Sequence, residues 1–396
     1  MCNGVAGVPH SPPIIYNIYM LPRIKINYLN GQLGTIPKSE DGLFAIVDAQ
    51  DGSEWPVEMH QDKVYIIRSL NDYTDLTDAA NIPLSAVVRQ FYQEASDGTE
   101  LVLYRPNYAD SNSILSELPD RVKNLQSQMG GRLRGVFVFG DLAKTEEDIE
   151  AITVAAQACA DGCLNTLFAP IFVCVQLGYA EFIANTEKDC RNVIAISGAD
   201  SDGTTIMGLF AGRLASIPVH RNVGRVKDGP LKHDGTLYLE SEPIVPGSMV
   251  EAYHDARCVV PRQYVGLSGY YFTDDPMFVK ETDDYAHLTA RRTIDKAYRI
   301  AYQTLVQFML DEIEVNEDGT MQNGVLKSWQ QAVENAINRQ MTAKGELSAT
   351  DGEGCVCFID PKQNVLATSR IELTLKVRPY GYARFIDVNL GFQVIA

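Results

Sequence analysis

The feature that most constrains this chain is residues 282–313, which read TDDYAHLTARRTIDKAYRIAYQTLVQFMLDEI. Apolar side chains recur there at spacings of three and four residues, which places them in one stripe along a helix of several turns. The stripe consists of Ile294, Ala297, Tyr298, Ala301, Leu305, Phe308 and Met309. Thr282 or Asp283 can cap the first turn, and we expect Arg291 and Arg292 to point away from the stripe. The stretch predicts a long core helix with a charged, solvated side.

Three further elements follow this helix. The sequence EVNEDGT predicts a sharp turn at Asp318 and Gly319. Residues 325–341 have the apolar spacing of a second amphipathic helix. CVCFIDP (residues 355–361) and IELTLKVRPYGYARFIDVNLGF (residues 371–392) then predict a pair of strands. We expect these parts to form one packed unit.

From Arg384 onward the chain alternates apolar and polar residues, which is the pattern of a strand with two different faces. The apolar face consists of Ile386, Val388, Leu390, Phe392 and Val394. A strand of this length leaves an unpaired edge unless another strand covers it. Two arrangements are open: the strand closes a sheet of its own chain, or it adds to a sheet of another subunit.

Residues 1–35 have the pattern of an extended arm. The prolines among them exclude a helix, and the run IIYNIYML is strongly β-prone and almost uncharged. This run contains Ile14, Ile15 and Ile18. Such a segment aggregates when it is left in solvent, so we expect either the chain's own core or a neighbouring subunit to cover it. Together with the closing strand, the arm favours strand exchange between subunits.

The middle of the chain predicts an outer α/β region over residues 36–215. Residues 36–108 have the strands and the single long helix of a small mixed module. Residues 109–215 alternate helical segments with continuous apolar runs such as GVFVFG and NVIAIS. Continuous apolar strands between helices indicate a parallel sheet that is covered on both faces.

The α/β region carries no common motif of an enzyme. The loop after NVIAIS, from Gly198 to Thr205, matches neither of the two common glycine-rich phosphate motifs. Asp200 and Asp202 would repel a phosphate, and the glutamate that would complete a calcium loop is missing. We therefore expect a polar loop that caps the following helix. The alternative interpretation is a soluble α/β enzyme or ligand-binding protein. Its site would lie at the C-terminal ends of the strands within residues 136–202, near residues 139–141 and 197–202.

The spacing of histidines and cysteines along the sequence indicates neither a catalytic nucleophile nor a metal site. His254 and Cys258 lie in a segment that reads at least as well as a strand, which would separate them by about 13 Å. The six histidines are scattered singly, so no metal cluster follows from their spacing. We assign no catalytic, cofactor-binding or metal-binding residue. Arg213, His220 and Arg221 are expected at the surface, in solvent or in local ion pairs.

Charge and composition narrow the class of partners. A chain of 396 residues is long enough for two or three domains. The formal net charge of −17 disfavours nucleic acid and anionic membranes as partners. Neither a secretory signal nor an apolar run long enough to span a bilayer is evident. Eight cysteines without C-x-x-C spacing predict reduced thiols in a cytosolic protein.

The order of parts in the last third resembles the C-terminal module of contractile tail sheath proteins of bacteriophages, R-type pyocins and related injection machines. The resemblance covers Arg291 and Arg292, the N-E-D-G-T turn at residues 316–320, and V-R-P-x-G-x-A-x-x-I-x-V at residues 377–388. It implies an α+β protomer with an α/β outer domain and extended β-strand arms. The arms would be residues 1–35 and 384–396, and the inner domain residues 216–383.

The resemblance also implies a function. Such a subunit polymerises helically around an inner tube and contracts by rigid-body rearrangement, without enzymatic activity or a cofactor. Its partners would be copies of itself, the inner tail tube protein, and the baseplate and tail terminator proteins. It would be part of a virion tail that is assembled in the bacterial host cytoplasm. By position, the helix of residues 325–341 and its flank would face the tube, through Lys327, Arg339 and Lys344.

Overall fold

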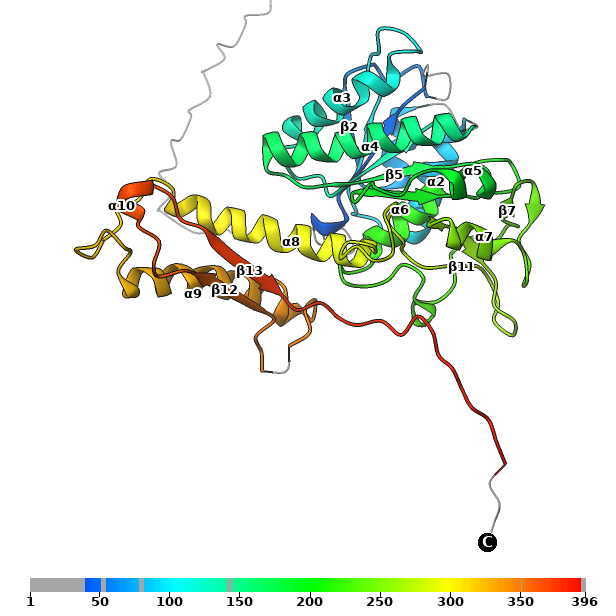
Figure 1. Ribbon diagram of the computed structural model, residues 1–396. Coiled ribbons are helices and arrows are strands. Elements are labelled where there is room, and N and C mark those ends of the chain that lie inside the picture. Colours follow the sequence, from blue (N-terminus) through cyan, green and yellow to red (C-terminus); the bar gives the residue numbers. More distant parts are fainter. Residues whose placement is uncertain are drawn as a thin grey trace, which may run out of the picture. The chain divides into compact units, whose positions relative to one another are not determined.

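A seven-stranded sheet packed against helices forms the centre of the largest hydrophobic core (Figure 1). Its strand order is β2-β3-β1-β4-β5-β6-β9. All neighbouring strands are parallel except β2, which runs antiparallel to β3. The strands are β1 (Phe44–Asp48), β2 (Val64–Ile67), β3 (Leu101–Tyr104), β4 (Gly135–Phe139), β5 (Phe172–Gln176), β6 (Val193–Ile196) and β9 (Cys258–Val259). The parallel sheet predicted from the continuous apolar runs is confirmed.

The computed structural model describes residues 40–50, 55–77, 82–140, 143, 145–349 and 351–392. All of these belong to one compact unit, Pro37–Ala396. The predicted N-terminal arm, with Ile14, Ile15 and Ile18, lies outside the described residues, and so does Val394. Among the described helices, none is both long and apolar enough to cross a membrane.

The sheet is larger than the sequence indicated. Strand β1 pairs with β3 on one side and with β4 on the other, so the predicted small module of residues 36–108 shares one sheet with residues 109–215. The sheet also gains β9 beyond residue 215, and its buried core continues to Leu288. Strands as apolar as FAIVD and LVLY need a paired strand at each edge and packed helices on each face. A single sheet that includes both parts of the chain provides these contacts.

Helices cover the sheet in two packed pairs. α3 (Ile114–Gln128) contacts α4 (Glu146–Leu167), and α2 (Pro83–Glu94) contacts α6 (Met207–Ser216). A capping box between Thr145 and Asp148 starts α4. Shorter elements of this region are η1 (Glu40–Gly42), α1 (Leu70–Leu76), α5 (Ala180–Asn185), η2 (Val226–Asp228), β7 (Tyr238–Leu239), β8 (Glu242–Pro243), α7 (Val250–Asp255), β10 (Pro261–Arg262) and β11 (Tyr271–Phe272).

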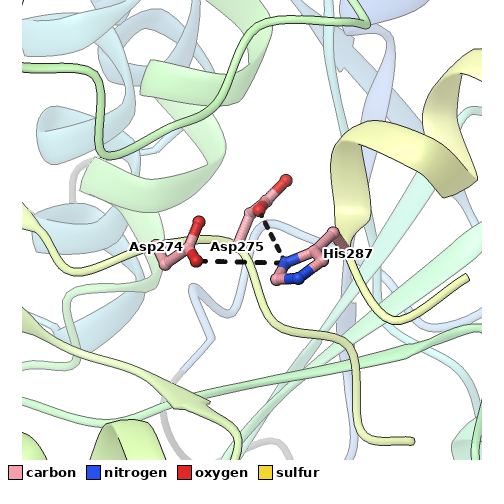
Figure 2. Close-up of side chains that lie close together, drawn as sticks. All are labelled: Asp274, Asp275 and His287. Carbon is pink, nitrogen blue, oxygen red and sulfur yellow. Dashed lines mark ion pairs between the residues drawn. The ribbon is translucent and has the colours of Figure 1, made fainter. Parts of the chain in front are cut away.

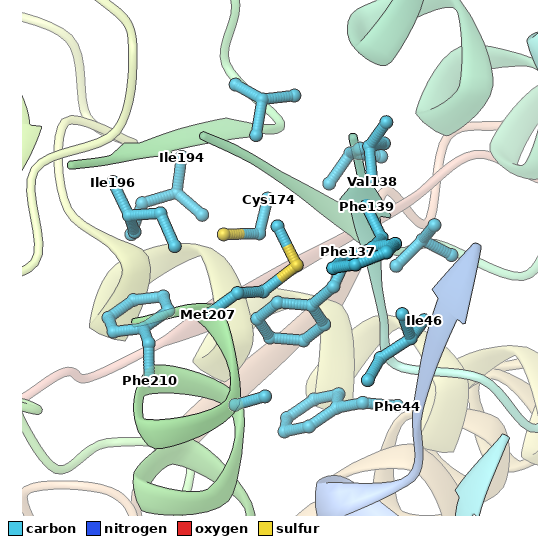
Figure 3. Close-up of a cluster of buried hydrophobic side chains, with 14 of the residues drawn as sticks. Phe44, Ile46, Phe137, Val138, Phe139, Cys174, Ile194, Ile196, Met207 and Phe210 are labelled. Carbon is cyan, nitrogen blue, oxygen red and sulfur yellow. The ribbon is translucent and has the colours of Figure 1, made fainter. Parts of the chain in front are cut away.

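Aromatic side chains fill the sheet face beneath α6 (Figure 3). Phe137 lies edge-on to Phe44, with ring centroids 5.4 Å apart, and to Phe210 of α6, at 6.4 Å. All three side chains are fully buried. Edge-to-face contacts add stabilisation to the burial of apolar area, so this cluster fixes how α6 lies on the sheet.

Two glycines let α6 approach α2 closely. A Cβ at Gly208 would lie 2.1 Å from the carbonyl oxygen of Val87, and one at Gly212 would lie 2.3 Å from that of Phe91. Both distances are far inside van der Waals contact. The G-x-x-x-G spacing on α6 is therefore required by packing against the backbone of α2.

A second core lies between α8 (Leu288–Leu305), α9 (Asn323–Gln340) and the antiparallel pair β12 (Cys355–Ile359) and β13 (Leu373–Val377). The predicted second helix and strand pair are thus confirmed, although the second strand ends at Val377. Cys355 and Cys357 face inward, while Val356 and Phe358 point outward. Connecting turns are η3 (Val306–Phe308), η4 (Thr342–Lys344) and α10 (Val365–Thr368).

The sequence reading of α8 is wrong in two respects. The helix begins at Leu288, so Thr282 and Asp283 do not cap it. Its charged side is also not solvated: Arg292 and Lys296 are buried, whereas Met309 of the predicted stripe lies beyond the helix and is exposed. The first turns of α8 are covered on several sides because the helix passes between the outer sheet and the second core.

The structure also corrects the strand that the sequence favoured around His254. His254 lies in α7, not in a strand, and Cys258 begins β9. Burial raises the pKa of the Cys258 thiol strongly, so the thiol stays protonated and packs as an apolar group.

Replacing Gly208 by alanine should destabilise the fold, because the added methyl group collides with the carbonyl of Val87. We expect the free energy of unfolding to fall by at least about 2 kcal/mol in denaturant titration. Gly162→Ala on α4 is the matched control, since its nearest neighbour is Lys123 Cδ at 4.0 Å, and it should stabilise by about 0.5–1 kcal/mol. Equal effects of the two substitutions would contradict close α2–α6 packing.

Candidate assembly site

Two aspartates and a histidine meet at the start of α8 (Figure 2). Asp274 and Asp275 follow β11, and His287 is the residue before the first turn of α8. His287 Nδ1 lies 3.2 Å from an oxygen of Asp275 and 3.9 Å from one of Asp274. Asp275 also caps the helix, because its carboxylate accepts the backbone N–H of Thr289 at 2.7 Å. This cap replaces the predicted one.

Arg384 completes this cluster from the far end of the chain. Its Nε donates to Asp274 at 2.7 Å, and its terminal nitrogen lies 3.3 Å from Asp275. Asn222 donates to both carboxylates as well, at 2.8 Å to Asp275. We call Asn222, Asp274, Asp275, His287 and Arg384 the anchor cluster.

The pKa values of the two carboxyls of the anchor cluster are shifted in opposite directions. Burial alone would raise the pKa of Asp274, but hydrogen bonds from Asp275 and Arg384 and the charge of Arg384 lower it to about 2. Burial raises the pKa of Asp275, and the neighbouring charge of Asp274 adds to this effect. Asp274 is therefore the ionised partner of Arg384 at neutral pH.

Residue spacing predicted no metal cluster, yet the fold brings together three groups that could hold a cation. Oxygens of Asp274 and Asp275 and a ring nitrogen of His287 all lie within 4.8 Å of one another. Here the guanidinium of Arg384 supplies the positive charge, and the Asn222 amide donates the remaining hydrogen bonds. This arrangement ties the C-terminal segment to the body of the protein.

Two tyrosines next to Arg384 strengthen this tie. The Tyr382 hydroxyl donates to the carbonyl oxygen of His220, and the His220 ring lies 5.2 Å from the ring of Tyr380. Burial, with the charge of Arg221, lowers the pKa of His220 to about 4. His220 is thus neutral at pH 7, contrary to its expected place among the basic surface residues.

Beyond Arg384 the described chain is extended and exposed, without secondary structure. The predicted strand of residues 384–396 is not formed in its described part: residues 378–392 contain no strand. Its apolar side chains are almost fully exposed, with Ile386 at 78%, Val388 at 77%, Leu390 at 95% and Phe392 at 105%. A strand requires a hydrogen-bonded neighbour, and no described segment of this chain provides one.

The other predicted site residues lie on or beside α9. Lys327, Arg339 and Lys344 are all exposed. Lys327 and Arg339 share one face of the helix with Gln331 and Asn335, at four-residue spacing. This face carries no acidic residue, which is unusual in so acidic a chain.

A cavity of about 680 Å³ lies at the strand ends where the enzyme interpretation placed its site. Its acidic groups have structural roles. Asp200 accepts the backbone N–H groups of Asp202 and Thr204, at 3.0 and 2.9 Å, so it closes its own loop. The loop residue Thr205 accepts the backbone N–H of Met207, the first residue of α6, at 3.1 Å. Glu240 accepts from the Tyr253 hydroxyl at 2.8 Å. Among the described residues that line the cavity, no serine hydroxyl is hydrogen-bonded to a histidine or a carboxylate, and Ser197 donates to the carbonyl oxygen of Gly178 at 3.3 Å.

Sequence reasoning missed the anchor cluster and misplaced one arginine. The consecutive Asp274 and Asp275 were the available signal, but their partner Arg384 is 110 residues away from Asp274. Arg213, expected at the surface, is buried in an ion pair of 2.9 Å with Glu94. Both pairs depend on tertiary contacts that spacing does not encode.

Replacing Arg384 by alanine should release the C-terminal segment and leave Asp274 and Asp275 without their cation. We expect faster hydrogen exchange at residues 380–384 and a loss of about 1–3 kcal/mol in the free energy of unfolding. The control is Arg370→Ala, whose pair with Glu372 is exposed and contributes about 0–1 kcal/mol. Unchanged exchange at residues 380–384 would show that the anchor cluster does not hold this segment.

The chain has the fold of contractile sheath proteins, so the resemblance seen in the sequence is confirmed. It matches a chain of the PVC sheath complex, from an extracellular contractile injection system in its contracted state, with TM-score 0.63 and 14% identity over 95% of this chain and 99% of that chain. A chain of the anti-feeding prophage baseplate matches with TM-score 0.62 and 16% identity, over 95% and 100% of the two chains. The sheath tail protein from Desulfitobacterium hafniense matches with TM-score 0.54 and 10% identity, over 90% and 100%.

No curated protein sequence matches this chain. Two family models match it in succession: the DUF2586 N-terminal domain over residues 21–276 and the DUF2586 C-terminal domain over residues 284–395. The boundary between them falls just before α8, beside the anchor cluster. The chain therefore belongs to the DUF2586 family.

Proposed function

We propose that this chain is the structural subunit of a contractile sheath, which polymerises helically around an inner tube and contracts to drive the tube through a target envelope. The observation that carries the proposal is the C-terminal segment. It is anchored at Arg384 and then exposes a row of large apolar side chains that no described part of the chain covers. The sheath fold over 95% of the chain supports it.

A neighbouring subunit is the natural partner of this segment. Its alternating pattern suits strand addition, and β12 and β13 form a two-stranded sheet whose described partners leave both outer edges open. Outward side chains of β12, Val356 and Phe358, are 55% and 54% exposed. Covering each large apolar side chain of the segment would contribute about 1.5–3 kcal/mol.

Strand links of this kind suit contraction. Each subunit keeps its own anchor cluster, so the link holds while the subunits rotate and shift as rigid bodies. A contact between two different surfaces propagates as a ring or a helix. The assembly needs no nucleotide and no enzymatic step. Its further partners are the inner tube, baseplate and tail terminator proteins, in a virion tail or related injection machine that is built in the bacterial cytoplasm.

Deletion of residues 385–396 tests the proposal, because it removes the exposed row and keeps Arg384 in the anchor cluster. Negative-stain electron microscopy should show hollow tubes for the full-length chain and dispersed particles for the deletion. Circular dichroism should report the same fold for both chains. Discrete particles from both would overturn the sheath proposal.

The exposed basic face of α9 is our candidate contact with the inner tube. Reversing its charges with Lys327→Glu and Arg339→Glu should give sheaths without a tube in tails purified from producing cells, because the attraction to the tube is lost. Arg89→Glu with Lys362→Glu removes two exposed cations elsewhere and should leave filled sheaths. Tube-filled sheaths from the α9 variant would assign the tube contact to another face.

A further inference from the structure

A groove of about 1020 Å³ lies next to the anchor cluster. Loop residues 220–227, residues 245–264 and the anchored start of the C-terminal segment line it. Its cationic side chains outnumber its carboxylates by five to two, although the chain carries a net charge of −17. The cations are Arg221, Arg225, Lys227, Arg262 and Arg384, and the carboxylates are Glu251 and Asp274. We call this the basic groove.

Two of these cations lack an acidic partner. Arg384 pairs with Asp274, and Arg225 pairs with Asp228 at 2.7 Å. Lys227 and Arg262 have no carboxylate within salt-bridge distance among the described residues; the Arg262 guanidinium lies over the ring of Tyr264, 4.3 Å from its centre. Apolar side chains complete the walls, among them Val245, which is 53% exposed, and Ile386. The basic groove thus suits an acidic segment with apolar side chains.

The chain itself contains such a segment at residues 309–318, MLDEIEVNED, which we call the acidic loop. Its five carboxylates are Asp311, Glu312, Glu314, Glu317 and Asp318. All five are exposed, and none pairs with a basic side chain in the described part of the chain. Leu310, which precedes them, is 99% exposed and Met309 is 68% exposed. An exposed apolar pair beside unpaired charges is typical of an interaction surface.

The acidic loop cannot fill the basic groove of its own chain. The groove lies at the start of α8, where Asp274 lines it and Asp275 bonds to Thr289. The acidic loop follows the other end of α8, where Ile313 packs against the small core around Met321. The 18 residues of α8 separate these two ends by about 27 Å.

We propose that the acidic loop of one subunit docks in the basic groove of a second copy of this chain. The inference rests on the proposed sheath and names a second contact between its subunits, beside the strand link. Because loop and groove are different surfaces, the contact is head-to-tail and propagates. The start of the C-terminal segment lines the groove. The strand link and the loop–groove contact therefore involve neighbouring parts of the same subunit.

Charge reversal on full-length chains tests this contact. Glu312→Lys with Glu314→Lys should reduce the pelleted, tubular fraction at least about tenfold at ~0.15 M salt, because like charges then meet. Lys227→Glu with Arg262→Glu should do the same. The chain that carries all four substitutions should assemble again, since the charges are exchanged and not lost.

The matched control is Glu181→Lys with Glu187→Lys, which reverses two exposed carboxylates elsewhere and should assemble normally. Normal assembly of either reversed pair, or failure of the fourfold variant to recover, would overturn the contact. Circular dichroism of each variant checks that the exposed substitutions leave the fold intact.

Zero-length cross-linking gives a readout that does not depend on tubes. A mixture of ¹⁴N- and ¹⁵N-labelled full-length chain, treated with a carbodiimide at high concentration, should yield a mixed-isotope link from Lys227 to Asp311, Glu312 or Glu314. Absence of this link overturns the contact. If the full-length chain forms no tubes, the sheath proposal fails, and the presence or absence of the link still decides whether loop and groove meet.

Discussion

The arrangement of this protein depends on two buried cations on α8. Arg292 donates to the carbonyl oxygen of Leu214, at 3.1 Å, at the end of α6. Lys296, one turn later, bonds to Asp41 at 2.5 Å and to Glu346 at 2.7 Å. Burial lowers the pKa of Arg292 to about 10, so it remains a cation at neutral pH. Removing one partner from such a pair would leave a buried charge uncompensated, which costs about 3–5 kcal/mol.

These contacts make α8 the connection between two hydrophobic cores. Leu288 at its start belongs to the core of the large sheet, while Ala297 and Ile300 belong to the core of α9 and the strand pair. Asp275 fixes the start of the helix, and the same carboxyl takes part in the anchor cluster that holds Arg384. The two cores and the root of the C-terminal segment are thus tied to one helix.

The C-terminal segment shows how a folded body and an unsatisfied strand coexist in one chain. Charge-assisted hydrogen bonds hold the segment up to Arg384, and beyond it Leu390 and Phe392 are bare to solvent. Apolar side chains so exposed cost free energy that a partner can recover. The five carboxylates clustered in the acidic loop repel one another, and an oppositely charged partner would relieve that repulsion. Both effects raise the free energy of a single chain in solvent, and assembly with other copies would remove them.

Local pattern in the sequence predicted the elements themselves. The apolar runs became β4, β5 and β6, and the three- and four-residue spacing became α8 and α9, because those periods follow from backbone geometry alone. The polar nature of the Asp200 loop was predicted from local pattern in the same way. The resemblance to sheath proteins came from the same local order of turn, helix and strand.

Only the tertiary structure decided which elements share a sheet and which charges are buried. It also decided that the C-terminal segment is anchored as far as Arg384 and is exposed beyond it. The position of β1 between β3 and β4, the burial of Arg292, and the meeting of Asp274 with Arg384 all join residues far apart in the chain. Such contacts depend on the complementary shape and charge of the folded surfaces, and the spacing of residues along a sequence carries no record of either.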